Sequence, residues 1–512
     1  MTWSYPADPS ITSLPALARS RMQDGGKVFI RNGDGRSFSF DETWALAGRL
    51  AGALRAHGVG KGDRVAVQVD KSPEAVILFL ACARAGAIFL PLNTAYTLNE
   101  VDYFVGDAEP RAIVAAPAKA SDLAELGARH KVAATLSLGT TGDGTLMEAA
   151  AAQDEDFADA PTDWDDLVAI LYTSGTTGRS KGAMLTHGNL ASNALALIET
   201  WRFTERDVLI HALPVYHTHG LFTATDTLLL SGGTMLFRAK FDADEVMRLM
   251  PEATTMMGVP TFYTRLLQHP GLTREATAHM RVFISGSAPL LAETHREFEA
   301  RTGHRIIERY GMTETNMNTS NPYDGDRIAG TVGLPLPGVA LRIADPDTGK
   351  VLQQGEIGMI ELKGPNVFRG YWRMPEKTAS EFRADGYFIT GDLGRIEPNG
   401  YVSIVGRGKD LVITGGFNVY PKEVETEIDA ISGVVESAVI GLPHADFGEG
   451  VTAVVVARPG TVDEAAVLAA LDGRLAKFKL PKRVLFVDDL PRNAMGKVQK
   501  NLLRERFNAL YR

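Results

Sequence analysis

Apolar and polar positions follow two periods along the first 165 residues. Residues 41–58 carry apolar side chains at helical spacing after an acidic start and end on a glycine, and residues 73–86 form a longer apolar helical run. Short strand-like runs occur at 64–69, 89–93 and 112–115. Helices that alternate with buried strands predict an α/β fold with a largely parallel sheet.

The pattern changes beyond residue 330, where short alternating strands stand among Gly and Pro residues. After residues 406–410, which have the composition of a boundary, come a helical run at 420–431 and a valine-rich strand at 451–457. We therefore predict a large N-terminal domain of α/β sheets (1–407) with a small β subdomain (about 330–407), and a small, mobile α+β C-terminal domain (408–512).

One polar stretch, residues 172–182 (YTSGTTGRSKG), separates two strand-like runs. Its glycines let the backbone approach a ligand closely, and Lys181 supplies a positive charge, so the stretch is typical of a triphosphate-binding loop. It is not the common P-loop, because Ser180 stands where the second glycine of that motif belongs. The alternative is a flexible surface linker, which the flanking strands disfavour.

Composition excludes several classes of protein. The chain has 512 residues, a net charge of −9 and 45% hydrophobic residues, so it lacks the basic surface that nucleic acids or anionic membranes attract. No apolar run approaches membrane-spanning length, and no basic start precedes an apolar segment, so we expect a cytoplasmic protein. The single cysteine, Cys82, lies in an apolar run and predicts a buried thiol.

Four further segments place small or polar residues after strand-like runs: 213–220, 258–265, 284–290 and 308–314. Loops of this kind form the ligand crevice of an open α/β sheet. His217 and His219 could suggest a metal site, but no cysteine or carboxylate cluster completes it, so a pocket-lining role for His217 is favoured over metal binding, with plain packing as the alternative.

Five of these motifs, in their order along the chain, resemble the adenylate-forming superfamily of acyl-CoA synthetases, luciferases and peptide-synthetase adenylation domains. They are YTSGTTGRSKG at 172–182, ERYGMTE at 308–314, YFITGDLG at 387–394, GRGKDLVITGGFNVYPKEVE at 406–425 and PRNAMGKVQK at 491–500. Within that superfamily the segments GVPTFYTRLL, SGSAPL and ERYGMTETNMNTSNPYDGDR are most similar to those of malonyl-CoA synthetases.

The resemblance implies that ATP, Mg²⁺ and coenzyme A take part in the reaction. For the β- and γ-phosphates it implies a set formed by Thr173, Ser174, Gly175, Thr176, Thr177, Gly178 and Lys181. For the rest of the nucleotide it implies Ser287, Ala288, Pro289, Glu308, Tyr310, Gly311, Met312 and Thr313, with Asp392 and Arg407 at the ribose. Glu314, with Thr173, would hold Mg²⁺, which prefers oxygen ligands.

The resemblance also assigns the chemistry. Lys497 would bridge the carboxylate and the α-phosphate during adenylation, with Glu314 and His217 as the other catalytic residues. The C-terminal domain would then rotate about a hinge at Lys409, so that Gly415, Gly416 and Phe417 face the pantetheine of coenzyme A. Nε-acylation of Lys497 by a lysine acetyltransferase, reversed by a deacetylase, would block adenylation, because it removes the charge.

Two arginines, Arg265 and Arg309, fall in segments that the resemblance puts beside the acyl pocket. A guanidinium offers the planar fork that a carboxylate matches, so with Ser287 and His217 they would bind the distal carboxylate of malonate or methylmalonate. The alternative is that either arginine pairs with a structural acid such as Glu308.

The predicted activity is therefore ATP-dependent ligation of malonate to coenzyme A through an acyl-adenylate, with release of AMP and pyrophosphate. Two alternatives stay open. The protein could be a stand-alone adenylating enzyme for another short acid or for a carrier-protein thiol, or a nucleotide-binding regulator without turnover. The joint presence of Lys181, Glu314, Asp392, Arg407 and Lys497 disfavours the regulator.

Overall fold

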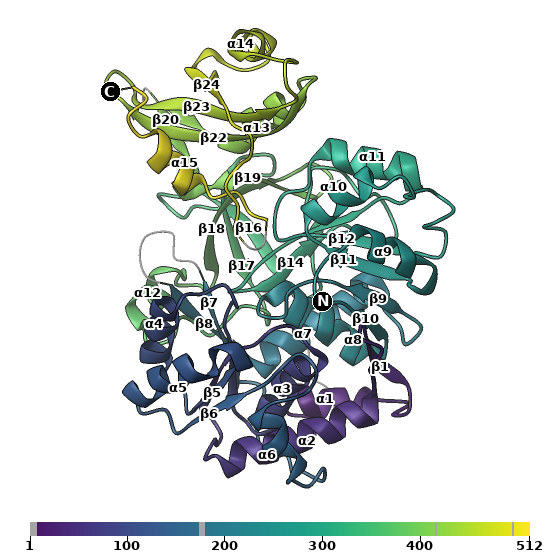
Figure 1. Cartoon of the computed structure of the whole chain (residues 1–512). Coiled ribbons are helices and arrows are strands. Elements are labelled where there is room, and N and C mark those ends of the chain that lie inside the picture. The colour runs from purple at the N-terminus through teal and green to yellow at the C-terminus, as the bar shows by residue number, and fades with distance from the viewer. Residues whose placement is uncertain (1–7, 174–179, 415–416, 494–495, 512) are drawn as a thin grey trace.

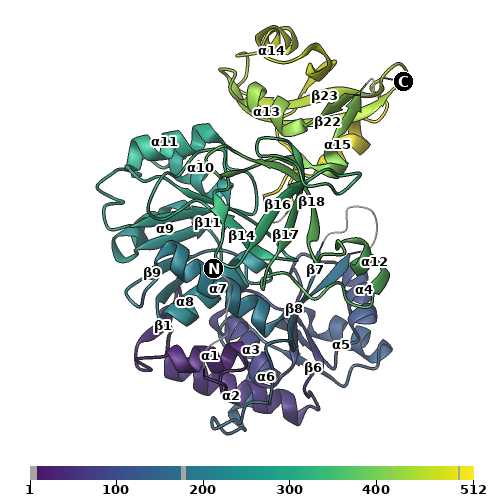
Figure 2. The same ribbon diagram turned by 180° about the vertical axis from the view of Figure 1, so that it is seen from behind.

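The computed structural model describes residues 8–173, 180–414, 417–493 and 496–511. A large N-terminal body carries a smaller C-terminal lobe, and Figures 1 and 2 show that lobe standing on one end of the body, above the strands β16–β19. Both large sheets of the body are α/β in character, which confirms the predicted fold class.

The first sheet of the body has six strands in the order β6-β5-β3-β4-β7-β8. Neighbouring strands are parallel except for the hairpin of β7 and β8. The strands are β3 (Arg64–Gln68), β4 (Ile88–Pro91), β5 (Ala112–Ala115), β6 (Ala134–Ser137), β7 (Leu167–Thr173) and β8 (Lys181–Thr186). The helices of this region are α1 (Leu14–Arg21), α2 (Phe40–Ala56), α3 (Pro73–Arg84), α4 (Leu98–Ala108), α5 (Ala120–Arg129) and α6 (Thr145–Ala151).

The second sheet has nine strands in the order β15-β14-β13-β12-β11-β9-β10-β1-β2. They are β1 (Val28–Asn32), β2 (Ser37–Ser39), β9 (Val208–His211), β10 (Thr234–Phe237), β11 (Thr255–Gly258), β12 (Val282–Ser285), β13 (Ile307–Met312), β14 (Asn316–Ser320) and β15 (Leu334–Pro335). The helices are α7 (His187–Trp201), a π-helical turn η2 (His219–Ala224), α8 (Thr225–Ser231), α9 (Ala243–Leu249), α10 (Pro260–Gln268) and α11 (Ala292–Thr302).

The motif at 308–314 is a strand that ends in a turn, as predicted, but the chain then returns as a second strand. Its first five residues belong to β13, which pairs in parallel with β12 and antiparallel with β14. The polar residues therefore turn tightly into a hairpin, where Met312 pairs with Asn316.

The remaining strands form the β subdomain and the C-terminal lobe. The subdomain is an antiparallel sheet of β16 (Ala340–Ala344), β17 (Gly358–Lys363), β18 (Phe388–Ile396) and β19 (Val402–Arg407), with α12 (Pro375–Ser380) beside it. The lobe holds β20 (Val412–Thr414), β21 (Phe417–Val419), β22 (Val434–His444), β23 (Gly448–Ala457) and β24 (Arg483–Phe486), with helices α13 (Pro421–Asp429), α14 (Glu464–Leu471) and α15 (Lys500–Phe507). The predicted boundary at 407/408 lies at the end of β19, just before a short 3₁₀ turn at Gly408–Asp410.

The largest apolar core joins the two large sheets of the body. Every residue of α3 is buried, which accounts for the continuous apolar run that predicted it, and Cys82 lies within this core as expected. A separate apolar cluster, centred on β22 and β23, fills the C-terminal lobe and gives it a core of its own. Among the described helices, none has both the length and the apolar character needed to cross a membrane.

Candidate functional site

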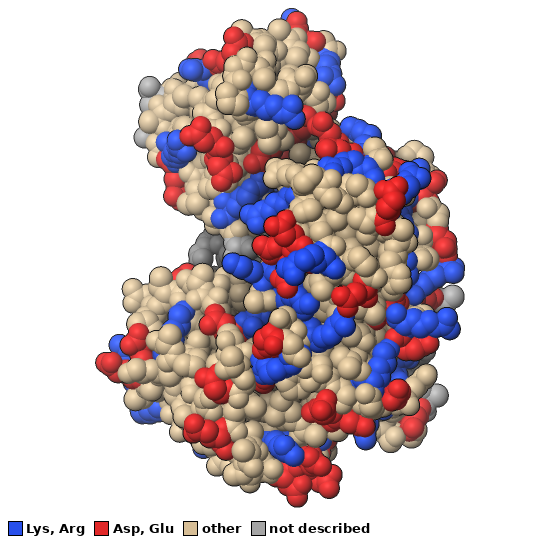
Figure 3. All heavy atoms as spheres, turned by 45° about the vertical axis from the view of Figure 1, so that its right-hand side comes forward, with Lys and Arg blue, Asp and Glu red and all other residues tan. Residues whose placement is uncertain are grey.

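A cavity of about 770 Å³ lies between the body and the C-terminal lobe. Figure 3 shows the hollow between the two parts, with lysine and arginine side chains along its edge. Its lining includes many residues that the sequence singled out: Thr173, Lys181, His217, Ser287, Arg309, Gly311, Met312, Thr313, Glu314, Arg407, Lys409 and Lys497. Local cations thus line the site of a protein whose net charge is negative.

The hairpin of β7 and β8 presents Thr173 and Lys181 as direct partners on neighbouring strands. Thr173 donates its hydroxyl to the Lys181 carbonyl at 3.4 Å. The Lys181 ammonium lies 3.3 Å from a carboxylate oxygen of Glu381 and 4.1 Å from the centre of the Tyr371 ring. The lysine is therefore held at the cavity wall by groups that a phosphate could replace.

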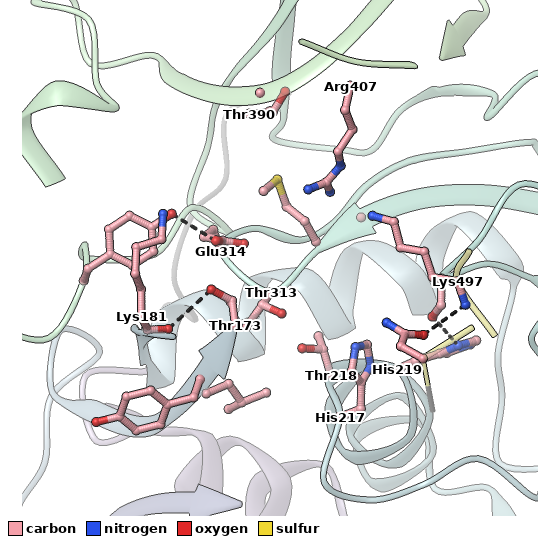
Figure 4. Close-up of a pocket in the computed structure, with 18 of the residues that line it drawn as sticks. Thr173, Lys181, His217, Thr218, His219, Thr313, Glu314, Thr390, Arg407 and Lys497 are labelled. Carbon is pink, nitrogen blue, oxygen red and sulfur yellow. Dashed lines mark hydrogen bonds between the residues drawn. The ribbon is translucent and has the colours of Figure 1, made fainter. Parts of the chain in front are cut away.

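Glu314 lies at the same end of the cavity, as Figure 4 shows. The Tyr371 hydroxyl is 3.0 Å from a Glu314 oxygen and 2.7 Å from a Glu381 oxygen, so its single proton can be donated to only one of them at a time. Burial raises the pKa of Glu314, whereas neighbouring Lys377 and the Tyr371 hydroxyl lower that of Glu381 despite its partial burial. Sequence reasoning missed Tyr371 and Glu381, which stand in segments without a recognisable motif.

A second polar group joins β13 to the β subdomain. Tyr310 donates to Asp392 at 2.5 Å, and the guanidinium of Arg407 pairs with the other Asp392 oxygen at 2.8 Å. Arg407 lines the cavity, whereas Tyr310 and Asp392 lie behind it. In this arrangement Asp392 orients Arg407, and the cavity surface at this point is cationic.

Lys497 reaches the cavity from the C-terminal lobe. Figure 4 shows its side chain across the cavity from Lys181, with the side chain of Arg407 nearby. Burial between the body and the lobe lowers the pKa of Lys497 to about 8. The Arg407 guanidinium lowers it further, whereas the Asp392 carboxylate raises it. An anion that entered between these cations would stabilise the charged form of the lysine.

This pKa predicts a pH dependence for any reaction step that needs the Lys497 ammonium. Because the lysine loses its proton as pH rises through about 8, kcat/KM for adenylation should fall above that pH, since kcat/KM reports on the free enzyme. The pH profile of pyrophosphate release checks this. A Lys497→Arg variant, whose guanidinium stays charged, should lose this falling limb even if its rate is lower. A wild-type profile that stayed flat to pH 9 would contradict the assignment.

Arg309 supplies a further cation to the lining of the cavity. Its side chain is 3% exposed, and its Nε and Nη2 atoms have no hydrogen-bond partner among the described residues. Burial lowers its pKa to about 9. A buried guanidinium without a partner is costly, and this one lines a cavity into which an anion can enter.

Neutral polar groups surround Arg309. The His219 amide donates to Nδ1 of His217 at 3.4 Å, and burial lowers the pKa of His217 to about 4, so its other nitrogen is a neutral donor. The second imidazole, His219, lies 3.2 Å from the Ser287 hydroxyl. Ser287 has a left-handed backbone (φ 72°), a strained geometry for a serine that is often found at binding sites.

Gly286 makes room for the guanidinium of Arg309. A Cβ atom at position 286 would lie 2.4 Å from Cζ of Arg309, and the backbone of Gly286 is not in the left-handed region. A Gly286→Ala variant should therefore fold but displace Arg309, and raise the KM for an acid bound there by about tenfold or more, as expected for a disturbed charged hydrogen bond. In an Arg309→Ala background the same change should have little further effect. Two independent, additive losses would contradict this coupling.

Several predicted residues lie outside the cavity. Arg265 is exposed on α10, whose inward face carries Tyr263 and Leu266, so the structure places only one of the two arginines at the cavity. The carboxyl of Glu308 is buried behind the wall, where it accepts from the Leu290 amide at 3.1 Å, and burial raises its pKa to about 7. Phe417 is exposed on the lobe, where it stacks on Phe478.

Ala288 and Pro289 follow Ser287 but do not line the cavity. Ser174, Gly175, Thr176, Thr177, Gly178, Gly415 and Gly416 lie outside the described residues. Within the described ranges, no three His, Cys, Asp or Glu side chains gather as metal ligands.

Two family models match the chain: AMP-binding enzyme over residues 17–372, and AMP-binding enzyme C-terminal domain over residues 423–497. The chain therefore belongs to the AMP-binding enzymes, which confirms the adenylate-forming family that its motifs resemble. The match covers both the body that carries Lys181 and the lobe that carries Lys497.

Among solved structures, the chain is similar to ATP-bound MatB from Rhodopseudomonas palustris, with 63% identity and a TM-score of 0.96 over 98% of this chain and 99% of that one. The apo form of MatB gives a lower TM-score, 0.86, at 64% identity over the same shares. Named relatives include a feruloyl-CoA synthase of Amycolatopsis sp (36% identical; 96% of this chain, 98% of the relative) and a malonate–CoA ligase of Arabidopsis thaliana (33% identical; 92% and 85%).

Proposed function

We propose that the protein ligates malonate to coenzyme A at the expense of ATP, through a malonyl-adenylate, and that methylmalonate is also accepted. The observation that carries the choice of acid is the buried guanidinium of Arg309, whose Nε and Nη2 find no hydrogen-bond partner in the described part of the chain, in the cavity that Lys497 enters. An apolar acid would leave this cation buried without a partner, whereas a short diacid supplies one. The similarity to the malonate–CoA ligase of Arabidopsis thaliana, over 92% of this chain, supports the same choice.

In the first step an oxygen of the reacting carboxylate attacks the α-phosphorus of ATP, and the bond to the β-phosphate breaks, so that pyrophosphate leaves. Thr173 and Lys181 would hold the outer phosphates, and Arg407 would hold the ribose with the support of Asp392. Lys497 would lie between the two anions and lower their repulsion where they meet. Arg309 and His217 would orient the diacid by its distal carboxylate.

Mg²⁺ fits the residues near Lys181. Glu314 offers one buried carboxylate at the cavity wall, and Mg²⁺ in nucleotide sites is usually held by one or two carboxylates together with phosphate and water oxygens. When bound, the ion would supply positive charge to the triphosphate. The role of this chain is to hold Glu314 in place, and the Tyr371 hydroxyl at 3.0 Å does so.

In the second step the sulfur of coenzyme A would attack the acyl carbon, AMP would leave, and the thiol proton would pass to solvent. Phe417, which would contact the pantetheine, is exposed on the lobe and does not line the cavity. We therefore propose that this step follows a rotation of the lobe about Lys409. The same movement would withdraw Lys497, whose acylation by an acetyltransferase we propose as a control on the first step only.

The product assay tests this function directly. Incubation with ATP, Mg²⁺, malonate and coenzyme A should yield malonyl-CoA, AMP and pyrophosphate in equal amounts, measured by mass spectrometry and phosphate release. Adenylation without thioester formation would favour a carrier-protein thiol as acceptor, and thioester formation only with another acid would correct the substrate. ATP binding without either product would favour the regulator.

A further inference from the structure

Helix α4 lies beside β7 and β8, the two strands that carry Thr173 and Lys181, in both views of the ribbon (Figures 1 and 2). The helix begins with a capping box formed by Thr97 and Glu100. Of the residues of α4 (Leu98–Ala108), Glu100 lines the cavity and the others do not. Tyr103 and Asp107 are four residues apart on α4, so they project from the same face.

Each of these side chains holds one strand of the hairpin. The Tyr172 hydroxyl donates to Asp107 at 2.5 Å, and Tyr172 directly precedes Thr173 on β7. The Tyr103 hydroxyl donates to the carbonyl of Ser180 at 2.7 Å, and Ser180 directly precedes Lys181 on β8. The residues next to both phosphate-facing side chains are thus bonded to a single helix.

A third contact ties α4 to the same hairpin from behind. The indole of Trp372 donates to the backbone carbonyl of Asp107 at 3.1 Å, while the Trp372 amide donates to the carbonyl of Gly182 at 2.7 Å. The neighbouring residue, Tyr371, is the one that bonds Glu314. Through Trp372, the end of α4 therefore supports the backbone next to Lys181 and the segment that carries Tyr371, the partner of Glu314.

We propose that Tyr103 and Asp107 are positioning residues for the triphosphate, and this rests on the proposed function. Asp107 holds the side chain of Tyr172 and Tyr103 holds the backbone of Ser180, so that Thr173 and Lys181 stand at a fixed separation before ATP binds. A site that is already ordered loses less conformational freedom on binding. We call Tyr103 and Asp107, with their bonds to Ser180 and Tyr172, the clamp. Its effect should fall on binding of the outer phosphates and not on binding of adenine, ribose or the α-phosphate.

The test compares ATP with AMP, which lacks the outer phosphates. Calorimetry should show that Tyr103→Phe weakens ATP binding by about 3- to 10-fold, the effect of one lost hydrogen bond, with AMP binding unchanged. Asp107→Ala should do the same or more, and Asp107→Asn, whose amide oxygen still accepts from Tyr172, should restore ATP binding. In steady state, KM for ATP should rise while KM for malonate does not.

The matched control is Asp102→Ala. Asp102 is on the same helix but pairs with Arg129 and His130, so its loss should leave ATP binding unchanged. Variants that lost ATP and AMP affinity together, or that lost neither, would overturn the clamp. Wild-type protein that bound no ATP would overturn the proposed function and the clamp with it.

Discussion

Lys497→Ala should lower malonate-dependent ATP–pyrophosphate exchange by about 10²–10³-fold, the usual effect of removing a group that stabilises charge in a transition state. The lysine enters the cavity from the C-terminal lobe, across from Lys181, and Lys409 is the other cation of the described part of that lobe that lines the cavity. Transfer of the acyl group from synthetic malonyl-adenylate to coenzyme A should survive, because the proposed rotation of the lobe withdraws Lys497 before that step.

Lys500→Ala is the matched control for this variant. Lys500 is three residues further along the same lobe but pairs with Glu425 at 2.5 Å and does not line the cavity. Its removal should leave the exchange rate close to that of wild type. Equal losses in the two variants would indicate a damaged lobe, and full exchange in Lys497→Ala would contradict the proposed role.

Arg309→Ala should lower kcat/KM for malonate by about 30- to 5,000-fold, from the roughly 2–5 kcal/mol lost when one partner of a buried charge pair is truncated. The loss should fall mainly on the diacid, because the proposed function assigns the guanidinium to the acid and not to the nucleotide. The kcat/KM for propionate, which has no distal carboxylate, should fall far less. The preference for malonate over propionate should therefore be largely lost. Steady-state kinetics with both acids measure this.

Two further variants make this second prediction specific. Arg309→Lys keeps a charge but not the planar fork, so it should recover only part of the activity. Arg248→Ala removes an exposed arginine from α9, outside the cavity, and should leave kcat/KM for both acids unchanged. An Arg309→Ala enzyme that still preferred malonate as strongly as the wild type would contradict the assignment of this residue.

Much of the fold was predictable because its elements carry strong local patterns. The continuous apolar run of α3 matches a helix that is buried on all sides, and the strand-like runs on both sides of 172–182 match β7 and β8. The hairpin at 308–314 was missed, since Gly311 and the polar residues after it suggest a loop. Thr313 and Glu314 do lie in a turn, but Gly311 and Met312 belong to β13, where they pair with Met317 and Asn316 of β14, a pairing that periodicity does not encode.

The site was predictable where a motif fixed the residue, as for Lys181, Glu314 and Lys497. It was not predictable where tertiary contacts decide which side chain faces the cavity. Arg265 and Arg309 look alike in sequence, but α10 leaves the first exposed, while β13 buries the second beside Gly286. Tyr371 and Glu381 come from a segment far from Glu314 in sequence, and only the fold brings their side chains together.

The central claim is that Thr173 and Lys181 on the body hold the triphosphate while Lys497 on the lobe promotes attack by one carboxyl of a short diacid. Arg309 binds the other carboxyl. Diacid-dependent ATP–pyrophosphate exchange by the wild-type protein, measured without coenzyme A, tests it most directly. The account predicts rapid exchange with malonate and far slower exchange with propionate or butyrate at the same concentration. Absence of exchange with malonate, or equal exchange with acids that lack the second carboxylate, would contradict it.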